Sequence, residues 1–131
     1  MNELTADLNA AIKRETRLRK RRDDAARTLT ASGYTSKELA APTSVQASRV
    51  RQYVTEGEHD DEYQSVQDFV KAFENWQKAN ARMNRLKYLR NQAVIDRVAA
   101  GARQVDVAAD FSISQFLVSH IVNSKQAGSL L

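Results

Sequence analysis

The sequence contains no cysteine, one proline and four glycines in 131 residues. Without cysteine, neither a disulfide nor a thiolate metal site is possible. The scarcity of glycine and proline leaves long stretches with no residue that ends a helix, so we predict a nearly all-helical protein. No apolar run approaches the roughly 18 residues that a membrane span requires, and the first residues lack a signal-peptide pattern. We therefore expect a cytoplasmic protein without membrane contact.

Charged residues are segregated along the chain. The 20 Lys and Arg exceed the 16 Asp and Glu, which gives a net charge of +4 and a pI of about 9.6. Residues 13–22 hold seven basic groups, residues 78–90 hold five with no acid, and residues 56–62 hold five acids. This balance suits a polyanionic partner but does not by itself identify one.

One pattern occurs twice, in residues 25–54 and again 68 positions later in residues 93–122. The identical pairs are Ala25/Ala93, Ala31/Ala99, Gly33/Gly101, Ala40/Ala108, Ala41/Ala109, Ser44/Ser112, Val50/Val118 and Val54/Val122. Five upstream pairs at the same offset are also identical: Ala11/Ala79, Arg14/Arg82, Arg17/Arg85, Leu18/Leu86 and Arg22/Arg90. We infer a duplicated unit of about 45 residues. Helical low-complexity sequence rich in Ala and Arg is the alternative.

Each unit is predicted to contain a long basic helix, a glycine that ends it, and a short helix–turn–helix. In the first unit, helices over 3–32, 36–41 and 46–54 are separated by Gly33 and by a turn at 42–44. The first of these is either continuous or restarts at Asp23. In the second unit we expect helices over 63–100, 104–110 and 114–123. The predicted organisation is residues 1–54, an acidic linker at 55–62, residues 63–123 and a flexible tail at 124–131.

The spacing of small and apolar residues in both copies is typical of two short helices crossing at a tight turn. It resembles the helix-turn-helix DNA-binding superfamily, in particular phage and plasmid repressors, Cro-type proteins and the DNA-binding domains of resolvases and transposases. The resemblance covers about 20 residues of each copy tightly and about 30 loosely. One departure is that Ser44 and Ser112 occupy the turn position that is usually glycine.

The resemblance implies a recognition helix in each copy that enters the major groove of DNA. In the first copy the implied DNA-binding residues are Thr35, Ser36, Gln46, Ala47, Ser48, Arg49, Arg51 and Gln52. In the second copy they are Arg103, Gln104, Ser114, Gln115, Phe116, Ser119 and His120. Arg and Gln make paired contacts with guanine and adenine edges. The second face is less basic, and Phe116 fits either contact with a thymine methyl group or packing on protein.

The long helices carry two further features. Arg14, Arg17 and Arg21 share one helical face, as do Arg82 and Arg85, which fits either phosphate contacts beside the recognition helices or a solvated charged face. An apolar stripe is formed by Val66, Phe69, Phe73, Trp76 and Met83. It is expected to form a core with Leu4, Leu8 and Ile12 of the first helix, or a homodimer interface in which Asn80 sets the register.

No catalytic motif, metal site or cofactor site is evident, so we do not expect an enzyme. We expect a sequence-specific protein for double-stranded DNA, a transcriptional regulator or repressor of phage or plasmid type in the bacterial cytoplasm or nucleoid. Its linker of about 10 residues would span roughly 35 Å when extended, enough to place both recognition helices on successive turns of DNA. The alternatives are a recombination accessory factor, such as an excisionase or the DNA-binding part of a transposase, and a helical module whose second copy docks on a protein.

Overall fold

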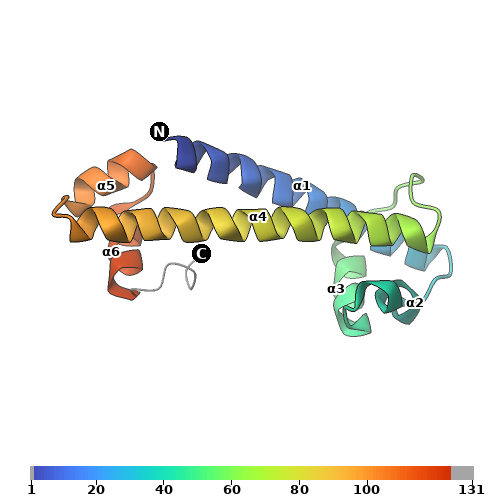
Figure 1. Cartoon of the computed structure of the whole chain (residues 1–131). Helices are drawn as coiled ribbons and strands as arrows, with labels where there is room; N and C mark the ends of the chain where they lie inside the picture. The colour runs from blue at the N-terminus through green and yellow to red at the C-terminus, as the bar shows by residue number, and fades with distance from the viewer. Residues whose placement is uncertain (1, 125–131) are drawn as a thin grey trace. The chain divides into compact units, whose positions relative to one another are not determined.

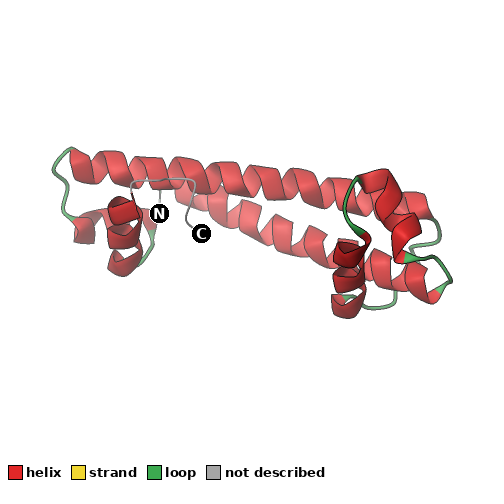
Figure 2. Cartoon of the chain, turned by 90° about the horizontal axis from the view of Figure 1, so that it is seen from below, coloured by secondary structure: helices red, strands yellow, loops and turns green. Residues whose placement is uncertain are grey.

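The computed structural model describes residues 2–124, and over that range it contains only helices, turns and loops (Figures 1 and 2). The elements are α1 (Glu3–Ala31), α2 (Ser36–Ala40), the 3-10 turn η1 (Ala41–Thr43), α3 (Ala47–Glu56), α4 (Val66–Ala99), α5 (Gln104–Phe111) and α6 (Gln115–Ser124). The prediction of an all-α fold is confirmed. Apart from Ser124, which ends α6, the predicted flexible tail lies outside the described residues.

The chain divides into two compact units, residues 14–80 and residues 1–13 together with 81–131. The division falls inside α1 and α4, and not at the predicted linker over residues 55–62. The reason is helix pairing, because Leu8 and Ala11 near the start of α1 form a cluster with Met83 and Leu86 of α4. The first turns of α1 therefore belong with the second copy of the repeat. We call residues 14–80 the first unit and the remainder the second unit.

In the first unit, local signals define each boundary of the helix–turn–helix. After α1, Gly33 has φ of +110°, and the Tyr34 N–H donates to the Leu29 carbonyl, which is a glycine-ended C-terminal motif. Pro42 follows α2 and has no N–H with which to continue it, so the chain tightens into η1. Ser44 then takes a left-handed conformation with φ of 62°, and α3 begins three residues later.

The second unit repeats this backbone path. Gly101 has φ of +104°, Ala102 N–H donates to the Arg97 carbonyl, and Ser112 is left-handed with φ of 55°. Helices α5 and α6 meet at 109°, within the range typical of helix-turn-helix units. The backbone thus adopts the same conformation at the repeated Gly and Ser positions.

The core of the first unit joins four helices. Leu29, Leu39, Val50 and Phe69 are fully buried in one cluster, and Figure 1 shows α2 and α3 beside the last turns of α1. The second unit has its own cluster, built on Val94, Val107, Phe111, Val118 and Ile121. Both copies of the helix–turn–helix therefore bury the apolar residues at matching repeat positions.

The apolar stripe of α4 packs inside the chain, and only part of it meets the predicted partners. Phe69 and Phe73 are buried in the cluster of the first unit, whereas Leu8 contacts the cluster that holds Met83 in the second. Phe69, Phe73 and Met83 are thus buried within the chain, whereas Val66 and Trp76 are partly buried. The predicted core between the stripe and Leu4, Leu8 and Ile12 is therefore found at Met83, whereas Val66, Phe69, Phe73 and Trp76 pack in the cluster of the first unit.

The acidic segment is not the extended linker that we predicted. Thr55 and Glu56 belong to α3. Gly57 is buried against the backbone of Asp23, and the Glu58 and Asp60 N–H groups donate to side chains of α1. The segment is therefore held within the first unit.

Across residues 2–124, no single helix has both the length and the apolar character needed to cross a membrane. Helices α5 and α6 meet those criteria only when the two are taken together, with the bend between them.

Candidate nucleic-acid interface

Helix α3 has one buried face and one exposed face. Val50 and Tyr53 are buried against α1 and α2, and Val54 packs at the edge of the same cluster. Gln46, Ser48, Arg49, Arg51 and Gln52 are exposed, as predicted for groove-facing residues. Ala47 is a correction, because it is half-buried and packs against the core. The β-carbon of Ala47 therefore helps to hold the start of α3 on the core.

Thr55 and Glu56 extend this exposed face beyond the predicted end of the helix at Val54. Thr55 lies three residues after Gln52 and so falls on the same side of α3. No helix-breaking residue precedes Gly57 in the sequence, and this absence was the available signal for the longer helix.

Two contacts hold the end of α3 on the scaffold. Arg27 Nη1 donates to the Val54 carbonyl at 3.2 Å, and Gly57 N–H donates to the Tyr53 carbonyl at 3.0 Å.

The start of α2 is closed by a reciprocal cap. Thr35 Oγ1 accepts a hydrogen bond from the Glu38 N–H, and Glu38 Oε1 accepts one from the Thr35 N–H. Thr35 is exposed and its hydroxyl proton remains a donor, whereas Ser36 is half-buried. The cap places a carboxylate beside Thr35 and Ser36, which we predicted to contact DNA. That contact therefore depends on the Thr35 hydroxyl rather than on free backbone N–H groups.

Arg22, beneath α3, has a structural role. Its Cζ lies 3.7 Å from the centre of the Tyr53 ring and 4.3 Å from that of Trp76, and its Nη2 lies 2.8 Å from Asp23 Oδ1. Burial raises the pKa of the Asp23 carboxyl, which Arg22 partly counteracts. This buried arginine links α1, α3 and α4 and is not available to a phosphate.

A surface groove of about 730 Å³ runs beside α3 in the first unit. Arg49 and Gln52 of α3 line it, together with Arg19 and Trp76. Trp76 Nε1 donates to Glu15 Oε2 at 2.9 Å, which fixes the indole at the wall of the groove. Basic, amide and aromatic groups therefore line one side of the exposed face of α3, together with the acidic residues Asp23 and Glu56.

The predicted phosphate contacts on α1 fall into two groups. Arg14 and Arg17 are exposed, but Arg21 is engaged by the acidic segment. Its Nη2 lies 2.8 Å from Glu62 Oε1, and its Nε donates to the Tyr63 hydroxyl at 3.3 Å. The hydrogen bond to Tyr63 raises the pKa of Arg21. A phosphate would have to displace Glu62 to reach this guanidinium.

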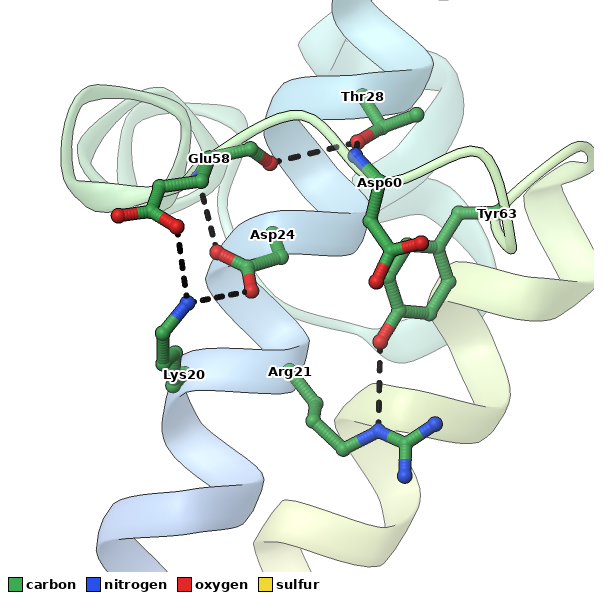
Figure 3. A network of polar contacts seen from close by, with 7 residues as sticks. All are labelled: Lys20, Arg21, Asp24, Thr28, Glu58, Asp60 and Tyr63. Atoms are coloured by element: carbon green, nitrogen blue, oxygen red, sulfur yellow. Dashed lines mark hydrogen bonds and ion pairs between the residues drawn. The ribbon is translucent and has the colours of Figure 1, made fainter.

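Figure 3 shows how the acidic segment is held on α1. Asp24 accepts hydrogen bonds from the Glu58 N–H and from Lys20 Nζ, at 2.8 and 2.9 Å, and Lys20 also lies 3.3 Å from Glu58 Oε2. These bonds, that to Asp24 first, raise the pKa of Lys20. Thr28 Oγ1 accepts from the Asp60 N–H at 2.8 Å and donates to the Glu58 carbonyl at 3.4 Å. Four residues of α1 thus bind the backbone and side chains of the segment.

The recognition helix predicted in the second unit has a different surface. Val118 and Ile121 of α6 are buried, whereas Gln115, Phe116 and His120 are exposed. Ser119 is half-buried, and Ser114 is exposed with its Oγ accepting the Leu117 N–H at 3.0 Å as the N-terminal cap. Asn123, which was not among the predicted contacts, extends the exposed face. This face carries no Lys, Arg, Asp or Glu.

The charged groups around α5 are paired with one another. Arg103 Nε lies 3.1 Å from Asp106 Oδ2, and Arg97 Nη1 lies 2.6 Å from Asp110 Oδ2. Gln104 is half-buried rather than fully exposed. Basic groups predicted to contact phosphate are exposed on α4, at Arg82 and Arg85. The two copies therefore share a backbone path but differ in the chemistry of their exposed helices.

Neither histidine is part of a metal site in the described part of the chain. His59 Nε2 lies 2.9 Å from Asp61 Oδ1, and His120 stacks on Phe116. Between residues 2 and 124, no group of three or more His, Cys, Asp or Glu side chains is placed to hold a metal ion.

No protein-family model, curated protein or solved structure matches this chain. What can be said of its function therefore rests on the residues and their geometry.

Proposed function

We propose that this chain binds double-stranded DNA with sequence preference, and that α3 is its principal reading helix. The observation that carries the proposal is the division of α3 into two faces. Val50 and Tyr53 anchor it to the scaffold, while Arg51, Gln52 and Ser48 project from the opposite side of a helix that follows a left-handed turn. Arg and Gln are the side chains that pair with guanine and adenine in the major groove.

The charge distribution supports the same partner. Arg14 and Arg17 are exposed on α1, and Arg82 and Arg85 are exposed on α4. Each phosphate contact made by such a group releases counterions and steepens the dependence of binding on salt by about one unit. In this proposal the arginines of the long helices supply affinity, and the α3 side chains supply discrimination between sequences.

The biological role that we propose is regulation of transcription, as a repressor of phage or plasmid type. A recombination accessory factor would use the same interface. The preferred DNA site separates the two, because a repressor site overlaps a promoter and an accessory factor binds beside a recombination junction.

The test begins with selection from a random duplex pool, followed by fluorescence anisotropy at about 150 mM salt. We expect an enriched site. Arg51→Ala should weaken binding by about 1–3 kcal/mol at one base pair and remove the preference there. Lys78→Ala is the matched control, because it removes one exposed positive charge of the first unit outside α3. Lys78→Ala should weaken binding to all DNA sequences by about the same factor, and that factor should be smaller than the effect of Arg51→Ala at its base pair. Absence of any enriched sequence would refute the proposal.

A further inference from the structure

Phe116 is the most exposed large apolar side chain among the described residues. It is 81% exposed, and its ring lies parallel to the imidazole of His120, with an interplanar angle of 4° and 6.3 Å between ring centres. Both rings are on the side of α6 opposite Val118 and Ile121, which are buried. Single exposed apolar residues are common on protein surfaces. What distinguishes Phe116 is its place at the centre of the outer face of this helix.

The repeat relates the position of Phe116 to the exposed face of α3. Phe116 corresponds to Ser48 and His120 corresponds to Gln52, both on the exposed face of α3. Helices α3 and α6 follow equivalent left-handed serines and bury equivalent valines. The outer face of α6 therefore occupies the same position on its helix–turn–helix as the outer face of α3 does.

The chemistry of the two faces indicates what α6 reads. The α6 face has no charged side chain, and Arg103 and Arg97 nearby are paired with Asp106 and Asp110. Such a face has no positive charge with which to bind a phosphate, but an aromatic ring on it can contact an apolar group. In the major groove of DNA the apolar group is the C5-methyl of thymine. The second unit as a whole has eight Lys and Arg against five Asp and Glu. This excess of positive charge favours a polyanionic partner.

We propose that α6 is a second reading helix and that Phe116 recognises the C5-methyl group of a thymine in the major groove. His120, stacked on the ring, restricts the orientation of Phe116 and offers ring nitrogens to a neighbouring base edge. The inference rests on the proposed function and adds a specificity determinant to it. It also implies an asymmetric DNA site, with one part read by Arg51 and Gln52 and the other by Phe116.

The experiment uses the full chain and the DNA site enriched by selection. Each thymine of the site is replaced in turn by deoxyuridine, which removes only the C5-methyl group, and affinity is measured by anisotropy. At one position the wild-type chain should bind the deoxyuridine duplex about fourfold more weakly, the effect of one methyl group losing its apolar contact. The Phe116→Ala variant should bind both duplexes equally. Val105→Ala, which trims another exposed apolar side chain of the same unit, should keep the fourfold difference.

Because Phe116 is exposed, we expect the Phe116→Ala variant to fold, and thermal melting followed by circular dichroism checks this. A flat deoxyuridine scan on an enriched site that responds to Arg51→Ala would overturn this inference and leave the proposed function intact. An equal loss of affinity by Phe116→Ala for thymine and deoxyuridine duplexes would also overturn it. If selection enriches no DNA at all, the proposed function fails, and this inference fails with it.

Discussion

The guanidinium of Arg22 lies between the rings of Tyr53 and Trp76, and its charge is balanced by Asp23. One arginine of the basic run thus connects α1 to the helix that we propose reads DNA. The side chains of Arg22 and Asp23 are only 8% and 11% exposed. Arg22 belongs to a run of basic residues, but its contacts are those of a residue in the core.

Arg22→Met should destabilise the first unit by about 3 kcal/mol, because the substitution leaves the Asp23 carboxylate buried without its partner. The free energy of unfolding from urea titration measures this effect. Arg17→Met, at an exposed position of the same helix, should change it by less than about 0.5 kcal/mol. Adding Asp23→Asn to Arg22→Met should recover part of the loss. Equal effects of the two methionine substitutions would contradict the structural role.

Gly57 is required for close packing rather than for backbone freedom. Its φ of −85° is accessible to any residue, but an added Cβ would collide with the backbone carbonyl of Asp23. Gly57→Ala should therefore cost about 1–3 kcal/mol, as overpacking typically does. The adjacent Glu58→Ala removes only an exposed ion pair with Lys20 and should cost less than about 0.5 kcal/mol. Wild-type stability in Gly57→Ala would show that the segment is loosely held.

Local structure was predictable where a short stretch of chain determines its own conformation. Gly33 and Gly101 end their helices with positive φ, and Ser44 and Ser112 form the left-handed turns that the repeat indicated. The buried positions of α3 and α6, such as Val50 and Val118, also follow from helical spacing. These features depend on neighbours within a few residues.

Long-range pairing was predictable only in part, since Met83 packs with Leu8 as expected but Phe69 and Phe73 do not. Helical periodicity shows that Leu8 and Phe69 are core residues, but it does not show which part of α4 faces which part of α1. The acidic segment was misread because polar composition with a glycine is typical of a linker. Its attachment depends on Asp24 and Thr28, which are more than 30 residues distant and accept its N–H groups. Ala47 was assigned to the wrong face for a related reason, since its partial burial depends on the core of the first unit.

Asp68 makes the stability of α4 depend on pH. Its carboxylate accepts the Gln64 and Ser65 N–H groups at 2.7 and 3.0 Å, and these bonds hold the pKa of Asp68 below its ordinary value. A carboxyl whose pKa is lower in the folded state contributes stability above the unfolded-state pKa of about 3.9. That contribution is lost as the pH falls through the folded-state pKa.

Asp68→Asn should therefore lower the melting temperature at pH 7, where the wild-type carboxylate is charged. The difference between the two proteins should shrink as the pH falls below about 4, because the wild-type side chain then becomes neutral too. Thermal melts of both proteins between about pH 7 and pH 2.5 measure the trend. A difference that stays constant over this range would mean that the charge of Asp68 does not stabilise the start of α4.

The acidic segment also bears on the DNA binding that we propose. Glu58 and Glu62 place two carboxylates against Lys20 and Arg21, on the helix that carries Arg14 and Arg17. Figure 3 shows the first of these pairs, between Glu58 and Lys20. The side chains of Glu58 and Glu62 are 78% and 59% exposed, so these ion pairs contribute little to stability. In the DNA complex that we propose, these carboxylates compete with phosphates for Lys20 and Arg21 and repel a phosphate placed nearby.

The double substitution Glu58→Gln with Glu62→Gln should strengthen binding to duplex DNA of random sequence by about threefold to tenfold at low salt. Freed of their carboxylate partners, Lys20 and Arg21 become available to phosphates, so the salt dependence should steepen by up to about two units. Anisotropy titrations at several salt concentrations measure both quantities. Glu74→Gln, an exposed acid of the same unit on α4, is the control and should change neither by a comparable amount. Unchanged affinity and salt dependence in the double variant would mean that DNA does not approach this face of α1.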